Sequence, residues 1–322
     1  MQRATLGSTG YSATRIGLGT MPLAIQGRPA ESDAVRVIHR ALDAGINWLD
    51  TADAYCLDDA DTGYGERLIA RALREWGGDR DRVMVATKGG CMRPKGGWTV
   101  DGKPARLKTA CERSLQALGV SSIFLYQLHA PDSATPFLDS VGALADLQRE
   151  GKIRHVGLSN VDVGFIKEAQ RVATIASVQN RHNAFDRGNF TSGVIDYCMR
   201  QHIAFIPHSV FGGHTGHTRA DESAPVVNVG KRRNLTPHQV VLLWMLETTP
   251  EVFPIPGAKR LESLESTLAA MDQRLEPEDM KELASAFPRE PITKTIAVRA
   301  KSEAKRIARQ VRRVVGRGGR SR

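Results

Sequence analysis

Four side chains suited to proton transfer follow three successive apolar runs of the chain. WLDTADAY supplies Asp50 and Tyr55, VMVATKGG supplies Lys88, and FLYQLHAPD supplies His129. A tyrosine keeps its proton up to a pH of about 10, and a neighbouring ammonium lowers that pKa because it stabilises the phenolate. A carboxylate beside the lysine keeps it charged, and an imidazole can donate a hydrogen bond to the same substrate oxygen. Such a set can polarise a carbonyl group and protonate the alkoxide formed by hydride transfer from a cofactor.

Each of these residues also has a purely structural interpretation. Asp50 could cap the following helix, and Lys88 could pair with it. Tyr55 could pack at a rim, and His129 could be a hydrogen-bonded buried histidine. Four such residues at consecutive strand ends are much less expected as independent accidents, so we interpret them as one site.

The apolar runs predict the elements that must position this site. Eight of them suit buried parallel strands: Ile16–Met21, Ile46–Leu49, Val83–Ala86, Ile123–Leu128, Ile153–Leu158, Ile175–Val178, Ile203–Ile206 and Val252–Ile255. Stripes with helical spacing lie between them: Val35, Ile38 and Leu42; Leu107, Cys111, Leu115 and Leu118; Leu261, Leu264, Leu268 and Met271.

This alternation, over about 270 residues, admits a closed (β/α)8 barrel or an open doubly wound sheet. Neither GLGTM (Gly17–Met21) nor TGYGE (Thr62–Glu66) is the GxGxxG turn that an open dinucleotide-binding sheet favours. We therefore predict an α/β fold, a (β/α)8 TIM barrel with its chemistry at the carboxyl ends of the strands. The first residues alternate around Gly7 and Gly10, which predicts a small β-hairpin that caps the bottom of the barrel.

Length and composition are those of a globular protein. The chain has 322 residues, of which 41% are apolar and 25% charged, so a wholly disordered chain is excluded. The longest strongly apolar run, Val240–Leu246, is too short for a membrane span, and the N-terminus lacks the apolar core of a signal peptide. Four scattered cysteines without a CxxC pair fit reduced thiols, and we expect a cytoplasmic protein without a metal site.

Two parts of the chain differ in net charge. Residues 289–322 contain 12 Lys and Arg against two acidic residues, whereas residues 1–288 contain 33 of each sign. We predict one barrel domain, 1–288, with no specific nucleic-acid partner, and a basic C-terminal tail, 289–322. In the tail, Ile296, Ala300, Ile307 and Val311 fall on one helical stripe, so it could contact anionic surfaces, either membrane or nucleic acid. A solvated tail without a partner is the alternative.

Several longer motifs resemble the aldo-keto reductase family, in the expected order along the chain. GINWLDTADAY (Gly45–Tyr55) with GERLIARAL (Gly65–Leu73) resembles the first signature, and VATKGG, YQLHAPD, GKIRHVGLSN and PIPGAKRLESL resemble later ones. The resemblance runs from about Ala4 to Phe287 and implies a catalytic tetrad of Asp50, Tyr55, Lys88 and His129. It implies Tyr55 as the general acid/base, NADP(H) as the cofactor, and a small carbonyl or alcohol substrate.

The same resemblance implies the residues that contact the cofactor. Ser159, Asn160 and Gln179 match the side chains that hold the nicotinamide carboxamide, and Lys259 and Arg260 are candidates for the 2′-phosphate unless they only begin an exposed helix. The other implied contacts are Thr20, Met21, His208, Ser209, Phe211 and Gly257.

Three departures from the family pattern bear on the site. His208 stands where the family often has a tyrosine that stacks on the nicotinamide, and an imidazole offers less area and a possible charge. Ser266 and Thr267 replace the common Glu-Asn near the adenine. An acidic insertion, Cys56–Tyr64, either reshapes one wall of the pocket or is a solvated loop. The segment Gly89–Lys103, with Met92 and Trp98, is expected to form another wall.

Two function classes remain open from the sequence. One is an NADP(H)-dependent oxidoreductase that reduces an aldehyde or ketone, or catalyses the reverse reaction. The other is a cofactor-binding regulatory or interaction protein on the same barrel with little turnover, because a fold alone does not fix function.

Overall fold

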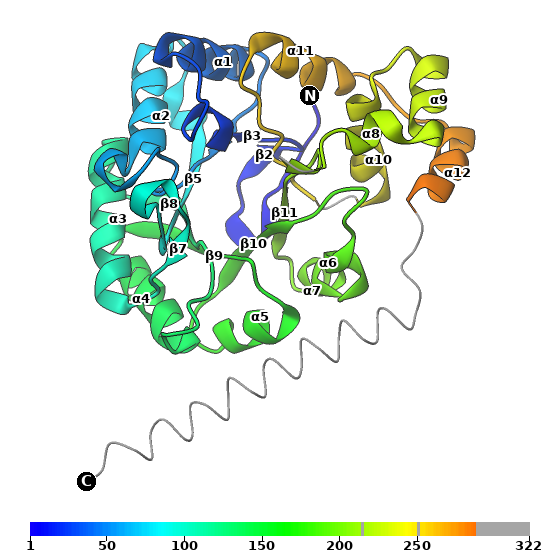
Figure 1. Ribbon diagram of the computed structural model, residues 1–322. Coiled ribbons are helices and arrows are strands. Elements are labelled where there is room, and N and C mark those ends of the chain that lie inside the picture. Colours follow the sequence, from blue (N-terminus) through cyan, green and yellow to red (C-terminus); the bar gives the residue numbers. More distant parts are fainter. Residues whose placement is uncertain (214–215, 250–251, 288–322) are drawn as a thin grey trace.

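A computed structural model describes residues 1–213, 216–249 and 252–287. Its centre is one parallel sheet whose strands follow each other in chain order around a barrel (Figure 1). The strands are β3 (Leu18–Gly19), β4 (Trp48–Asp50), β5 (Met84–Gly89), β8 (Ile123–Leu128), β9 (Ile153–Ser159), β10 (Ile175–Arg181) and β11 (Ala204–His208). Each overlaps one of the predicted apolar runs, because parallel strands buried on both faces need continuous apolar sequence.

The predicted eighth strand, Val252–Ile255, closes the barrel as an extended segment rather than as a regular strand. On one side Phe253 N donates to Phe205 O at 2.9 Å, and on the other Gly17 N donates to Pro254 O at 3.0 Å. Isolated parallel bridges join Val252 to Phe205 and Gly257 to Gly19. Pro254 and Pro256 have no N–H to donate, so the ladder is interrupted here.

Helices surround the sheet as an outer ring (Figure 1). They are α1 (Glu31–Asp43), α2 (Tyr64–Glu75), α3 (Pro104–Leu118), α4 (Phe137–Arg149), α5 (Val163–Ala169), α6 (Gly188–Thr191), α7 (Val194–Arg200), α8 (Arg219–Glu222), α9 (Ala224–Arg233), α10 (Pro237–Thr248), α11 (Leu261–Ala270) and α12 (Pro277–Ala286). The predicted stripes of α1 and α3 are buried against the strands, as are Leu264 and Leu268 of α11. The predicted (β/α)8 architecture is confirmed.

The N-terminal hairpin covers the bottom of the barrel, as predicted. Strand β1 (Arg3–Thr5) pairs antiparallel with β2 (Ser12–Thr14), and Leu6 between them is fully buried in the lower core. A Cβ on Gly7 would lie 2.4 Å from Ala176 O and 2.6 Å from Ala204 N, both at the beginning of barrel strands. The opposite end, where the strands finish, is therefore the end left open for a site.

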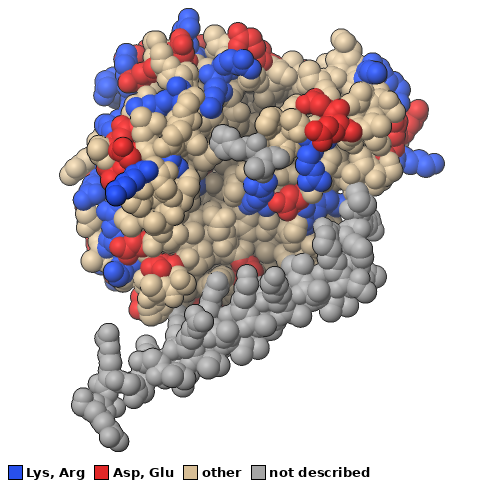
Figure 2. All heavy atoms as spheres, viewed as in Figure 1, with Lys and Arg blue, Asp and Glu red and all other residues tan. Residues whose placement is uncertain are grey.

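A second small hairpin follows β5. Strands β6 (Cys91–Met92) and β7 (Thr99–Val100) pair antiparallel within the loop that the sequence predicts to be one wall of the pocket. Basic and acidic side chains are interspersed over the face in Figure 2, in keeping with the balanced charge of residues 1–288. Among the described residues, no helix is long and apolar enough to cross a membrane. The predicted tail, 289–322, lies outside the described residues.

Candidate active site

The site is built around the buried ammonium group of Lys88, which is 0% exposed. Its Nζ donates to Asp50 Oδ1 at 2.6 Å, to the Thr51 carbonyl at 2.8 Å and to the Tyr55 hydroxyl at 3.1 Å. Asp50 ends β4 and Lys88 lies near the end of the adjacent β5, so parallel pairing of these strands brings the two together. One cation thus holds a carboxylate and a phenol at the open end of the barrel.

The charges of this triad are fixed by burial and by one another. Burial alone would lower the pKa of Lys88, but Asp50 and Tyr55 outweigh burial and raise the pKa, so the ammonium stays charged. Burial raises the pKa of Tyr55, and the opposing effect of Lys88 does not cancel it. The lowering by Lys88 expected from sequence is present but is smaller than the desolvation of the phenolate. Tyr55 therefore holds its proton at neutral pH, as a proton donor must.

Asp50 is held from three further directions. Its Oδ2 accepts hydrogen bonds from Gln179 Nε2 at 2.8 Å and Gln127 Nε2 at 3.4 Å, and its carbonyl oxygen accepts from Thr20 Oγ1 at 2.9 Å. Gln127 is a contact that sequence reasoning missed. Its place in β8, two residues before His129, is the one signal that could have found it.

His129 follows β8 and stands beside the phenol. The rings of His129 and Tyr55 meet edge to face, with centroids 5.8 Å apart. Burial, together with Lys88 and His208, holds the pKa of His129 well below its ordinary value, so the ring is neutral. Its buried Nδ1 has no hydrogen-bond partner among the described residues. A neutral imidazole can donate one hydrogen bond to a substrate oxygen without bringing a charge.

His208, at the end of β11, is uncharged in this structure, although a histidine side chain can carry a positive charge. Burial, with Lys88 and Arg181, lowers the pKa of His208 to about 4, so its ring is neutral at physiological pH. Its Nδ1 lies 3.0 Å from Ser209 Oγ. Ser209 has φ +57, a left-handed conformation that non-glycine residues adopt at a cost and that tends to occur at functional sites. Phe211, two residues further on, packs edge to face on His238 rather than on the tetrad.

The residues expected at the nicotinamide lie together on neighbouring strands. Ser159 ends β9, and Asn160 Nδ2 donates to Ser159 Oγ at 3.1 Å and to the His129 carbonyl at 2.9 Å. Asn160 also has a left-handed φ of +58. Gln179 lies in the adjacent β10, where its amide nitrogen is used by Asp50. Polar groups therefore border the tetrad on the β9–β10 side.

Other residues expected to contact the cofactor, including the candidates for the 2′-phosphate, lie at or near the barrel seam. Thr20 is buried, and Met21 begins the turn Met21–Leu23. Gly257 bridges to Gly19, and a Cβ there would lie 2.7 Å from Pro22. Lys259 Nζ is 3.4 Å from the position of a Cβ on Gly27, and Arg260 directly precedes α11.

Within the described part of the chain, neither Lys259 nor Arg260 forms an ion pair with a carboxylate. Two such cations at a glycine-lined seam fit a phosphate group. Thr267, one of the two departures near the adenine position, is buried and bonds the Ser263 carbonyl at 3.1 Å. Among the described residues, no group of three His, Cys, Asp or Glu side chains could hold a metal ion.

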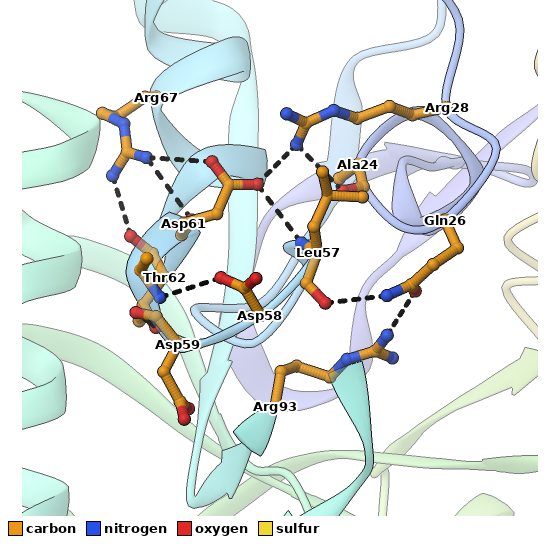
Figure 3. A network of polar contacts seen from close by, with 11 residues as sticks. Ala24, Gln26, Arg28, Leu57, Asp58, Asp59, Asp61, Thr62, Arg67 and Arg93 are labelled. Atoms are coloured by element: carbon orange, nitrogen blue, oxygen red, sulfur yellow. Dashed lines mark hydrogen bonds and ion pairs between the residues drawn. The ribbon is translucent and has the colours of Figure 1, made fainter. Parts of the chain in front are cut away.

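The acidic insertion after Tyr55 is partly anchored and partly exposed (Figure 3). Asp61 Oδ2 accepts from Arg28 Nη1 at 2.6 Å and from Leu57 N at 3.2 Å, and Arg67 approaches the other carboxylate oxygen at 3.8 Å. Asp58 faces solvent. The expectation of a solvated loop holds for residues 58–60, whereas Leu57 and Asp61 are held by neighbouring segments. A role of the insertion as a wall of the pocket stays a prediction.

The comparisons with known proteins agree on one family. A sequence model described as the aldo/keto reductase family matches residues 15–287. An uncharacterised oxidoreductase of Schizosaccharomyces pombe is 34% identical over 270 residues, which are 82% of this chain and 83% of the relative. The crystal structure of a thermostable aldo-keto reductase with the inhibitor epalrestat has a TM-score of 0.75 at 26% identity, covering 88% of this chain and 99% of that one. An aldo/keto reductase from Klebsiella pneumoniae in complex with NADP and acetate also has a TM-score of 0.75, at 24% identity over 90% and 97% of the two chains.

Proposed function

The chain belongs to the aldo/keto reductase family, and from this premise we propose that it is an NADP(H)-dependent oxidoreductase that interconverts a small carbonyl compound and its alcohol, with Tyr55 as the general acid/base. The observation that carries the proposal is the position of Lys88 Nζ, within hydrogen-bond distance of both Asp50 Oδ1 and the Tyr55 hydroxyl. A buried phenol bonded to a buried ammonium can release its proton and take it back without leaving an unpaired charge.

Each residue of the tetrad has a different role in the proposed reaction. When bound, the nicotinamide supplies or accepts the hydride. Tyr55 donates its hydroxyl proton to the carbonyl oxygen of the substrate, and Lys88 stabilises the phenolate left behind. Asp50 keeps Lys88 charged and in place, and the neutral His129 orients the substrate oxygen by a hydrogen bond. In the reverse direction, the phenolate takes the proton of the alcohol.

The preference for NADP(H) rests on Lys259 and Arg260. Both are cations at the barrel seam without a carboxylate partner among the described residues, and a 2′-phosphate would supply the missing negative charge. The similar Klebsiella pneumoniae structure contains NADP, which supports the same cofactor here. The carboxamide would be held by Ser159, Asn160 and Gln179, beside the neutral ring of His208.

The test is NADPH oxidation in the presence of aldehydes, diketones and quinones. We expect turnover of at least one class, and a Lys88→Met variant that binds NADPH with little turnover serves as the matched control. Tight NADPH binding without turnover of any compound would instead support a regulatory or interaction protein on this barrel. The complete contact set around Lys88 favours the enzyme, because a binding protein does not need a tuned proton donor.

A further inference from the structure

Arg93 is a buried guanidinium that forms no ion pair with any other residue that the structure describes. It follows β6, is 3% exposed, and packs with its Cζ 4.3 Å from the ring centroid of Trp98. Its Nη2 donates to Gln26 Oε1, and its buried Nε has no hydrogen-bond partner among the described residues. Its two partners, an amide oxygen and an indole ring, carry no net charge.

The acidic residues of the neighbouring insertion are directed elsewhere (Figure 3). Asp61 pairs with Arg28 at 2.6 Å and lies 3.8 Å from Arg67, and Asp58 Oδ1 accepts from the backbone of Ala60 at 3.0 Å. Among the residues that the structure describes, no carboxylate forms an ion pair with Arg93. Burying a charge is costly unless an opposite charge compensates it. A neutral side chain could hold Gln26 as well, so the charge itself requires an explanation.

The position of Arg93 connects it to the tetrad. The Trp98 ring, against which Arg93 packs, meets the ring of His129 edge to face with centroids 6.0 Å apart. His129 in turn contacts Tyr55. Gln26, the other partner of Arg93, donates to the Leu57 carbonyl at 2.7 Å, two residues after Tyr55. Trp98 is 49% exposed and packs on both Arg93 and His129, so a substrate group that approaches the guanidinium from the tetrad would have to displace this indole ring.

We propose that Arg93 determines substrate specificity by binding an anionic group of the substrate, and that the substrates are carbonyl compounds bearing a carboxylate or phosphate at a distance from the reacting carbonyl. This inference rests on the proposed oxidoreductase function. The anion would complete the charge balance of Arg93 while the carbonyl oxygen faces Tyr55 and His129. A guanidinium suits this role because it forms two parallel hydrogen bonds to a carboxylate or phosphate.

The test compares matched anionic and neutral substrates. The kcat/KM for 4-carboxybenzaldehyde is measured against 4-methylbenzaldehyde, and that for glyceraldehyde 3-phosphate against glyceraldehyde, so the two pairs separate carboxylate from phosphate recognition. We expect the wild type to prefer the anionic member of one pair. Arg93→Gln should lower kcat/KM for that member by about 10- to 100-fold through KM, the range expected for one charged hydrogen bond, and leave its neutral partner unchanged. Arg93→Lys should retain part of the preference.

Arg67→Gln is the matched control, because Arg67 belongs to the same loop network but its side chain is 52% exposed and lies near Asp61. Equal losses for anionic and neutral substrates in Arg93→Gln would show that Arg93 only holds the loops together and would overturn the proposal, as would a wild type without preference for either anion. Turnover of the neutral aldehyde reports on the oxidoreductase function separately. If no aldehyde turns over, calorimetric binding of benzoate to wild type and Arg93→Gln decides the anion site alone, and equal affinities would reject it.

Discussion

At the scale of single residues, the buried charges of the site belong to one ion pair, and the proton proposed for transfer belongs to a different side chain. Lys88 and Asp50 form an ion pair that is almost completely buried, so each compensates the charge of the other. Tyr55 is the member whose proton can leave, and the pKa of its phenol is raised by burial. A protonated phenol is the form needed for carbonyl reduction. The neutral rings of His129 and His208 add hydrogen bonds and contact area without competing for the proton.

Tyr55→Phe tests the proton donor. The change removes one oxygen and keeps the ring, so we expect carbonyl reduction to fall by about 10²–10⁴-fold, the usual contribution of one acid/base group. NADPH affinity, measured by fluorescence titration, should be nearly unchanged. Tyr64→Phe is a control of the same chemistry outside the tetrad, since Tyr64 packs under Arg28. Full activity of Tyr55→Phe would remove this residue from the role of general acid/base.

The paired substitution Lys259→Ala and Arg260→Ala tests the 2′-phosphate contact. Each charged hydrogen bond to a phosphate contributes about 1.5–3 kcal/mol, so NADPH binding should weaken strongly and NADH binding little. Dissociation constants for both cofactors are the measurement. Equal losses for NADPH and NADH would show that these residues hold something other than the phosphate.

The sequence predicted which residues meet at the strand ends but not how charge is balanced around them. Asp50 and Lys88 could be placed together because adjacent parallel strands bring their ends to one edge. The pairing of Asp61 with Arg28, and the lack of a carboxylate partner for Arg93 among the described residues, depend on loop conformations. The spacing of residues along a loop does not determine its conformation, so these features became visible only in the structure.

At the scale of elements, an acidic pair lies buried where α2 packs near β5. Glu66 of α2 accepts from Thr87 Oγ1 of β5 at 2.6 Å, but its other oxygen has no partner among the described residues. Burial raises the pKa of Glu66 to about 7. Burial and the neighbouring Glu66 raise the pKa of Asp53 to about 8, against the opposing charge of Arg106 on α3. The folded protein therefore holds these carboxyls protonated where an unfolded chain would ionise them.

The raised pKa values of Asp53 and Glu66 predict how the stability of the fold depends on pH. A carboxyl whose pKa is raised by folding stabilises the fold fully below its ordinary pKa of about 4, and this contribution is lost as the pH rises through the folded value. The free energy of unfolding should therefore fall between pH 5 and pH 8.5, by about 1.4 kcal/mol for each unit by which folding raises a pKa and that is titrated in this range.

Asp53→Asn should reduce this fall, with a higher Tm than wild type at pH 8.5 and a similar Tm at pH 5. The measurement is thermal or urea unfolding at the two pH values. Asp272→Asn, at an exposed position, is the control and should leave the slope unchanged. If Asp53→Asn and wild type showed parallel pH profiles, Asp53 would be ionised in the folded protein.

At the scale of the whole molecule, the barrel is closed by a seam rather than by an eighth full strand. The apolar run Val252–Ile255 was sufficient to predict the position of this segment, but the prolines at 254 and 256 prevent a continuous ladder. Gly257 belongs to the same seam, which lies just before Lys259 and Arg260, the residues that we propose to bind the cofactor phosphate. The β6–β7 hairpin, by contrast, could not be predicted, because two strands of two residues each have no readable period. The domain boundary at residue 288 and a cytoplasmic location stay predictions.

The tail is where the net charge of +10 lies, and its role can be separated from that of the barrel. With 12 basic residues against two acidic ones, residues 289–322 should bind anionic vesicles or nucleic acid in a salt-sensitive way, because screening weakens such attraction beyond about 10 Å at 0.1 M salt. Truncation after Pro288 should abolish this binding, measured by co-sedimentation or mobility shift at low and high salt, and leave kcat/KM intact. A full-length chain that binds neither surface would identify a solvated tail without a partner. Loss of NADPH turnover in a truncated barrel that remains folded would place the tail in the active site, since every group of the tetrad lies before it in the chain and none is removed by the truncation.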